Sequence, residues 1–353
     1  MGRLATRKDA VSVTLVTYNS GRFIKRCLES VLEQDYPDME VIVIDNASTD
    51  GTPDILEQFE TKCSIHYNEE NLGFAAGQNQ AIALSSCEWV LALNPDVLLK
   101  RDFISELVAA GQLDAKAGTI CGKLLSISAS FDLPEKQLVD STGIFFTPTL
   151  RHLDRGSLET DNGHYRDFEY VFGATAAAAL YRRKMIEDLS IMGEFFDADF
   201  FVYREDADVA WRAQLLGWRC LYTPNAVGYH VRSVLPGRRR ALPADINMHS
   251  VKNRFLMRIK NMTPELYRRN WLAITARDLV VLGACLLHEH SSLKAFGYVL
   301  KNWKRVMGKR REIMRRRRVE HNYIASWFAF EPTSLPAPKP AGLKAQSRAA
   351  RRG

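Results

Sequence analysis

Two hydrophobic periods alternate along the first hundred residues. Short apolar runs rich in β-branched residues, typical of buried strands, occur at 11–17, 40–45, 64–67 and 89–93. Apolar residues recur at helical spacing at 22–34, 74–85 and 101–111, and a shorter helix is expected to be capped near Asp50 or Thr52. This alternation predicts an α/β fold with a mostly parallel central sheet flanked by helices.

The next stretch is less regular. Ile120–Leu125 is compatible with a strand, whereas 126–170 has no clear period and is expected to form irregular or hairpin structure over a pocket. Phe172–Tyr181 fits a strand or a helix by composition. A helix over 206–216, ended by Gly217, and short strands over 220–222 and 227–230 are expected to complete the domain.

Beyond His230 the composition changes, and three parts are expected. Residues 1–235 form the α/β domain, 236–330 a basic amphipathic helical extension, and 331–353 a disordered basic tail rich in Pro and Ala. The apolar segment 271–287 contains Arg277 and Asp278 and is too short and too polar to predict a transmembrane helix.

The charge is divided in the same way. The net charge of +7 combines residues 1–230, with 21 Lys and Arg against 34 Asp and Glu, with the remaining chain, with 27 against 7. This asymmetry indicates a polyanionic partner, for which a nucleic acid, a solvated basic face without a partner and an anionic membrane are the alternatives. The six cysteines are scattered without a metal-binding or disulfide pattern, which fits a reducing compartment.

Polar residues follow three of the predicted strands. Thr17-Tyr18-Asn19, Asp45-Asn46 and Asn94-Pro95-Asp96 each come directly after a strand, and Asn71–Asn79 opens a helix with Gly73 and Gly77. Ligands of parallel sheets bind outside the carboxyl ends of the strands. Asp45 and Asn46 could read a nucleobase edge, the helix start could approach a diphosphate, and Asp96 could hold a divalent metal. Each motif alone also fits a turn or a helix cap, and only their conjunction favours a site.

A second acidic cluster lies at 205–208. Glu205, Asp206 and Asp208 begin the predicted helix, and the aromatic residues just upstream could exclude water and tune a general base. The alternative is ordinary acidity at a helix N-terminus. His230 ends a strand and is either structural or a metal ligand.

These motifs, in this order, resemble those of a known family. TYNS, VIDNASTDGT, NLGFAAGQN, NPD, FGA, EDADVAWR and a strand-terminal His230 are similar to family 2 glycosyltransferases of the GT-A fold, and within them to the rhamnosyltransferase-like branch, over about residues 11–235. The resemblance implies that Asp206 is the catalytic base and that Asp96 and His230 bind the metal. It implies an acceptor side formed by Gly173, Ala174, Glu205 and Trp211. It implies a donor site formed by Thr17, Tyr18, Asn19, Asp45, Asn46, Asn71, Gly73, Phe74, Gly77, Asn79 and Asn94.

We therefore expect an inverting transfer of a sugar, with rhamnose as one candidate, from a dTDP- or UDP-linked donor to a hydroxyl of a glycan or lipid-linked acceptor. Mg²⁺ or Mn²⁺ is the expected cofactor, although Asn94 stands where an Asp is common in the metal motif and removes one charge. The expected location is cytoplasmic, peripheral on the inner face of the cytoplasmic membrane, with no nucleic-acid partner. A nucleotidyl-transferring enzyme and a non-catalytic polyanion-binding protein are the alternatives.

Overall fold

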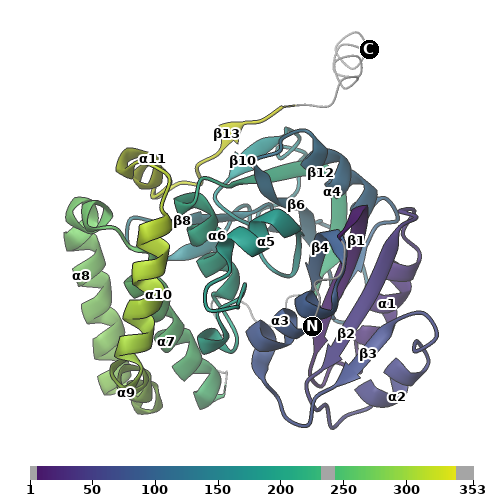
Figure 1. Cartoon of the computed structure of the whole chain (residues 1–353), viewed down its shortest axis with the longest axis horizontal. Coiled ribbons are helices and arrows are strands. Elements are labelled where there is room, and N and C mark those ends of the chain that lie inside the picture. The colour runs from purple at the N-terminus through teal and green to yellow at the C-terminus, as the bar shows by residue number, and fades with distance from the viewer. Residues whose placement is uncertain (1–5, 232–242, 339–353) are drawn as a thin grey trace.

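The computed structural model describes residues 6–231 and 243–338 (Figure 1). Its first part alternates strands and helices where the apolar pattern predicts them. These elements are β1 (Arg7–Thr17), α1 (Ile24–Leu32), β2 (Met39–Asp45), α2 (Thr52–Glu57), β3 (Ser64–Tyr67), α3 (Gly73–Leu84), β4 (Cys87–Leu93), β5 (Val97–Leu99) and α4 (Phe103–Gln112).

The second part contains the strands that the sequence left open. It comprises β6 (Ala117–Ser126), β7 (Val139–Ser141), β8 (Ile144–Phe146), β9 (His152–Asp154), β10 (Glu169–Val171), β11 (Ala178–Arg182), α5 (Arg183–Leu189), the short 3-10 helix η1 (Ala198–Phe200), α6 (Glu205–Leu215) and β12 (Arg219–His230). The ambiguous run at 172–181 ends in strand β11, and the two short strands predicted after Gly217 are one strand, β12. The irregular stretch includes the β8–β9 hairpin.

The main sheet is mixed, with the order β13-β10-β12-β6-β11-β4-β1-β2-β3. Strands β3, β2, β1 and β4 are parallel neighbours, and β6 and β12 are parallel to each other. Strand β11 pairs antiparallel with both β4 and β6, so these two parallel groups point in the same direction. The predicted α/β architecture, with mostly parallel strands flanked by helices, is confirmed.

Helices cover both faces of this sheet (Figure 1). Along β4, Trp89, Leu91 and Leu93 belong to a buried cluster that includes residues of α1, α2 and α4. Val90 and Ala92, which alternate with them, belong to a second cluster with residues of α3, α5 and α6. The two-residue period of a strand therefore divides one continuous apolar run between two cores.

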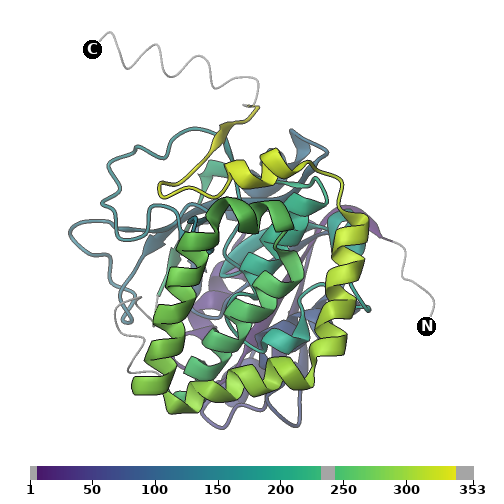
Figure 2. The same cartoon turned by 90° about the vertical axis from the view of Figure 1, so that its left-hand side faces the viewer.

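The C-terminal helices pack against the α6 side of the domain, as Figures 1 and 2 show. They are α7 (Ala244–Asn261), α8 (Pro264–Leu287), the 3-10 helix η3 (His290–Leu293), α9 (Lys294–Lys301), α10 (Trp303–Arg316) and α11 (His321–Ser326). Leu256, Val306 and Ile313 belong to the same buried cluster as Trp211 of α6. The basic extension thus shares a core with the α/β domain, and the predicted boundary at 235–236 lies outside the described residues.

Buried ion pairs join these two parts. The Lys309 Nζ lies 2.6 Å from Asp197 Oδ1, and the Lys260 Nζ bonds the other oxygen of Asp197 and lies 3.0 Å from Asp208 Oδ1. Asp208 also pairs with Arg212 at 2.9 Å. Positive charges of the extension therefore neutralise carboxylates of the acidic part.

The prediction of a disordered tail over 331–353 is wrong for Leu335 and Pro336. Leu335–Pro336 forms β13, which pairs antiparallel with β10 at the edge of the sheet. Backbone hydrogen bonds to an open sheet edge require no particular side chains, so a Pro- and Ala-rich composition did not reveal them. Residues 339–353 of the expected tail lie outside the described residues.

Candidate active site

The strand-end motifs meet at one edge of the sheet. Thr17 at the end of β1 is paired in parallel register with Asp45 at the end of β2. Leu15 of β1 pairs with Leu93 of β4, so Asn94 and Asp96 leave β4 at the same edge. This juxtaposition is the one expected for a nucleotide site at the carboxyl ends of parallel strands.

The loops after β1 and β2 hold each other. Asp45 is 1% exposed, and its carboxylate accepts hydrogen bonds from the backbone N–H (2.9 Å) and hydroxyl (2.6 Å) of Ser48. Asn19, at φ 50°, donates its N–H to the Ser48 hydroxyl and accepts one from the Thr49 N–H, both at 2.8 Å. Tyr18 is exposed beside them. The paired loops form a rim at the carboxyl ends of β1 and β2.

Three of the amide side chains predicted to bind the donor form hydrogen bonds within the protein. Asn46 is 1% exposed, and its amide donates to Gly73 O (3.1 Å) and accepts from Asn68 (2.8 Å). Asn71 accepts from the Gly73 N–H, and Asn79 is bonded to the backbone of Phe195 and Phe196. These amides position the loops around the site. The hydrogen bonds of Asn46 indicate such a structural role and not the expected contact with a nucleobase.

The two glycines of α3 allow close packing. Gly73 has φ +81°, and a Cβ there would lie 2.5 Å from the Phe201 ring and 2.6 Å from its carbonyl oxygen. A Cβ on Gly77 would lie 2.8 Å from Val16 Cγ1, so this glycine lets α3 approach β1. Phe74 lines the catalytic cavity described next.

A cavity of about 390 Å³ brings the catalytic candidates together. Its wall contains residues of the motifs at 94–96 and 205–208, the strand-terminal histidine, and residues that the sequence did not single out. They are Phe74, Asn94, Asp96, His152, Asp154, Thr175, Ala176, Ala177, Val202, Tyr203, Arg204, Glu205, Asp206 and His230.

Asp206 lies at the first turn of α6 and reaches this cavity. Its carboxylate accepts hydrogen bonds from the N–H groups of Ala207 (2.7 Å) and Ala176 (3.3 Å). Burial and the negative charge of Asp154 raise its pKa to about 6, against the lowering effect of these bonds and of Arg204. A carboxylate with such a pKa is suited to accept a proton near neutral pH. Burial and the charge of Asp206 also raise the pKa of the adjacent Glu205 well above its usual value.

Asp96 and His230 lie side by side on the wall of the same cavity. His230 Nε2 lies 3.5 Å from Asp96 Oδ1, while His230 Nδ1 is 2.8 Å from the buried carboxylate of Asp140. Burial lowers the pKa of His230, but Asp140 and Asp96 more than offset this and raise it to about 10. The two carboxylates therefore favour the positively charged form of the His230 ring.

This arrangement fits a divalent cation. A carboxylate that fixes the far nitrogen of a histidine is the usual support for a metal-binding imidazole. The described residues contain no group of three or more His, Cys, Asp or Glu side chains able to hold a metal by themselves. Mg²⁺ sites in phosphate-binding enzymes commonly use one or two protein ligands and complete the shell with phosphate oxygens and water.

The predicted acceptor side is shifted along the chain. Ala174 and Trp211 are buried, and a Cβ on Gly173 would lie 2.2 Å from that of Ala210. Trp211 lies among the rings of Phe146 and Phe328 in the core. All three residues therefore occupy packing positions. The cavity is lined by the next residues, 175–177, and of the predicted acceptor side only Glu205 lies on its wall.

Sequence reasoning missed Asp140, His152, Asp154 and Arg204. The first three lie in the stretch without a period, where no pattern assigned a face to any side chain. For Arg204 a signal existed, since it directly precedes the acidic motif. Its φ is +74° and that of Tyr203 is +68°, and such backbone outliers cluster at functional sites.

The chain also matches a known protein family. Residues 12–190 match the model of the family described as "Glycosyl transferase family 2". The chain belongs to glycosyl transferase family 2.

Two curated relatives illustrate the family. The chain is 24% identical over 221 residues to the poly-beta-1,6-N-acetyl-D-glucosamine synthase of Staphylococcus epidermidis, which covers 62% of this chain and 49% of that protein. It is 39% identical over 98 residues to the putative teichuronic acid biosynthesis glycosyltransferase TuaG of Bacillus subtilis, covering 27% and 39%. The chain thus spans about half or less of the length of these relatives. Neither bears on the rhamnosyltransferase-like branch, which stays a prediction.

Among solved structures, TarS 1-349 of S. aureus has the same fold. It superposes with a TM-score of 0.52 at 18% identity, covering 86% of this chain and 83% of that chain. Its complex with UDP-GlcNAc gives a TM-score of 0.52 at 16% identity, covering 87% and 89%. These structures confirm the GT-A architecture.

Proposed function

We propose that the chain is an inverting glycosyltransferase that moves a hexose from a nucleotide-diphosphate sugar to a hydroxyl of a glycan or lipid-linked acceptor. The observation that carries this proposal is the carboxylate of Asp206, which has a raised pKa and lies in one cavity with the Asp96–His230 pair. A base and a cation-binding pair in one cavity supply the two requirements of a direct displacement at the anomeric carbon.

The chain's own residues would act as follows. Asp206 accepts the proton of the acceptor hydroxyl while that oxygen forms a bond to the anomeric carbon. The bond from this carbon to the diphosphate oxygen breaks, its electron pair leaves with the nucleoside diphosphate, and the configuration inverts. Asp96 and His230, with the carbonyl of Asn94, would hold Mg²⁺ or Mn²⁺, which supplies Lewis-acid neutralisation of the departing charge.

The donor would lie along the sheet edge, with its nucleoside on the rim formed by Thr17, Asn19 and Asp45. The buried Thr17 hydroxyl has no hydrogen-bond partner among the described residues. A screen with UDP-GlcNAc and dTDP-rhamnose tests the nucleobase and the sugar together. The family assignment disfavours both nucleotidyl transfer and non-catalytic polyanion binding.

Asp206→Asn tests this function. We expect the turnover of the donor to fall about 10²- to 10⁴-fold, as for loss of a general base, while donor binding by calorimetry is kept. Glu57→Gln, an exposed change on α2, is the control and should leave turnover unaltered. Unchanged turnover of Asp206→Asn would remove the base assignment, and turnover unaffected by chelation of divalent cations would remove the metal.

We also propose that the protein lies peripherally on an anionic membrane through α8. By length and composition α8 could cross a membrane, and only 11% of its most apolar window is buried. Its outer face exposes Trp271, Leu272, Leu279, Val280, Leu286 and Leu287. Asp278, in the middle of α8, pairs with Arg258 of α7, and a helix held to the protein by such a pair is suited to lie in the interface. Exposed Lys301 and Lys304 beside exposed Leu300 and Trp303 add attraction to anionic headgroups.

The double variant Leu279→Glu/Leu286→Glu tests this membrane surface. Its co-sedimentation with phosphatidylglycerol vesicles should fall at least about tenfold, because both side chains lose their apolar contact with lipid. Leu133→Glu, at a position 61% exposed in a loop away from α8, is the matched control. Equal sedimentation of the double variant and this control would contradict the assignment.

A further inference from the structure

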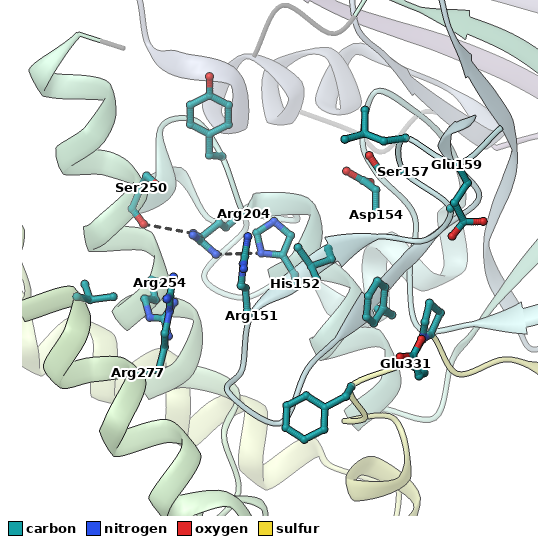
Figure 3. Close-up of a pocket in the computed structure, with 18 of the residues that line it drawn as sticks. Arg151, His152, Asp154, Ser157, Glu159, Arg204, Ser250, Arg254, Arg277 and Glu331 are labelled. Atoms are coloured by element: carbon teal, nitrogen blue, oxygen red, sulfur yellow. Dashed lines mark hydrogen bonds between the residues drawn. The ribbon is translucent and has the colours of Figure 1, made fainter. Parts of the chain in front are cut away.

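A larger cavity adjoins the catalytic one. Its volume is about 660 Å³, and His152, Asp154, Tyr203 and Arg204 line both cavities. In Figure 3, Arg204 and His152 lie between Ser250 of α7 on one side and Asp154, Ser157 and Glu159 on the other. The larger cavity therefore lies beside the one that Asp206 lines.

Arginines dominate one side of this cavity. Arg254 of α7, Arg277 of α8, Arg151 and Arg204 line it, and Figure 3 shows them gathered on the side of the C-terminal helices. The carboxylates of Asp154 and Glu159 lie across the cavity from this group. The guanidinium of Arg204 donates to Ser250 O (3.2 Å) and bonds His152 Nδ1 (2.9 Å), which fixes it between the two cavities.

Two members of this group, Arg254 and Arg277, are incompletely paired within the described residues. Arg254 is 4% exposed, and its Nε lies 3.8 Å from Asp278 Oδ1. Both oxygens of Asp278 already bond Arg258. Among the described residues, neither Arg254 Nε nor Arg277 Nε, both buried, has a hydrogen-bond acceptor.

The pKa of Arg254 also reflects its burial among like charges. Burial, followed by the nearby charge of Arg258, lowers the pKa of Arg254 to about 10, with Arg277 and Arg151 acting in the same direction. A buried cation is costly unless an anion pairs closely with it. Arg254 is buried and lies 3.8 Å from its nearest carboxylate partner, so a ligand with negative charge would stabilise this side of the cavity.

We propose that this cavity binds a phosphate or pyrophosphate group of the acceptor and so places the acceptor hydroxyl at Asp206. The proposal rests on the function proposed above and adds the chemical class of its acceptor. Several guanidinium groups around one cavity match the oxygens of a phosphate, which accept paired N–H bonds from each fork. The donor diphosphate has its own place at the sheet edge, near Asp96.

The cavity also indicates two sources for this phosphate. Its wall includes the apolar side chains of Phe145, Leu153, Val281 and Phe330. Val281 belongs to α8, whose outer face is the proposed membrane surface. A lipid pyrophosphate would place its charged group on the arginines and its chain along this wall, whereas a phosphorylated glycan would use the arginines alone.

Calorimetric titration of the full chain tests the proposal, first with inorganic pyrophosphate and then with farnesyl pyrophosphate, both with a chelator to exclude divalent cations. Arg277→Gln should weaken pyrophosphate binding at least about tenfold, because one charged donor pair is removed. Arg254→Lys should also weaken pyrophosphate binding. This variant is chosen over Arg254→Gln because it keeps the positive charge at a buried position and is therefore more suited to fold. Arg268→Gln, on α8 with a side chain 73% exposed, is the matched control and should bind as the unaltered chain does.

The outcomes separate the alternatives. Tighter binding of farnesyl pyrophosphate than of inorganic pyrophosphate supports a lipid-linked acceptor, and equal binding supports a phosphorylated glycan. Pyrophosphate binding that is absent, or the same in Arg277→Gln and Arg254→Lys as in Arg268→Gln, overturns the proposal. Because this titration uses no sugar donor, its failure leaves the turnover test of Asp206→Asn intact, and failure of that test leaves the anion site intact.

Discussion

The neighbouring carboxylate of Asp154 should control the pH at which the enzyme loses activity. Asp206 accepts a proton only when ionised, so activity should fall as the pH drops through its pKa of about 6. Burial is the largest cause of the raised pKa, and the charge of Asp154 is the second. The substitution Asp154→Asn removes this charge at nearly constant volume, and it should therefore lower the pKa of Asp206.

The expected size of this effect follows from the charge that is removed. The pKa of Asp206 is raised from 3.8 to about 6, with burial as the largest cause and Asp154 as the second. Removal of one nearby carboxylate charge should lower the pKa by about one unit. At pH 5.5 such a shift increases the ionised fraction of Asp206 about threefold, since it rises from roughly a quarter to roughly three quarters.

The assay is the pH dependence of kcat/KM for release of nucleoside diphosphate, which reports the ionisations of the free enzyme. Relative to its own value at pH 8, Asp154→Asn should be more active at pH 5.5 than the unaltered enzyme. Asp206→Glu, which keeps the acid, should retain an acidic limb, and Asp206→Asn should lose it. An acidic limb that stays in place in Asp154→Asn, or moves to higher pH, would refute this reasoning.

Two predictions concern stability. Gly77→Ala should lower the free energy of unfolding by about 1–3 kcal/mol in urea, because the added Cβ would lie 2.8 Å from Val16 Cγ1. Gly283→Ala, in open space on α8, should be neutral or slightly stabilising, and equal effects of the two would contradict the packing argument. Lys309→Met should cost about 3 kcal/mol, because it removes one of two buried cations from Asp197. The exposed Lys304→Met should cost little, and a similar loss in both would disprove a role for burial.

The strands and helices near the N-terminus could be predicted because each apolar run there has a single period. The edge of the sheet could be predicted as well, since parallel strands bring Thr17, Asp45 and Asp96 together whatever the loops do. The wall opposite that edge could not. Asp154 reaches the cavity through the short β8–β9 hairpin, whose pairing depends on contacts distant in sequence.

The same limitation explains why packing residues were taken for ligand-binding residues. Trp211 and Asn46 both lie next to residues of the site, and sequence alone gives the position of a residue in a motif but not the direction of its side chain. In the structure Trp211 is 0% exposed, and the amide of Asn46 bonds Gly73 and Asn68. A motif thus locates a site to within a turn of helix, and the packing decides which of its members face the ligand.

The division of charge along the chain shows what composition can and cannot indicate about partners. The excess of cations after His230 predicted a polyanionic partner, yet Lys260, Lys309 and Arg318 neutralise Asp208, Asp197 and Asp188 of the acidic part. A count of charges cannot distinguish such internal pairs from a surface that awaits a ligand. Only cations without adequate internal partners carry the argument for a partner. Among the described residues, Arg254 and Arg277 each have a buried Nε that bonds no acceptor, and both line the cavity for which we propose a phosphate of the acceptor in place of a long polyanion spread across the surface.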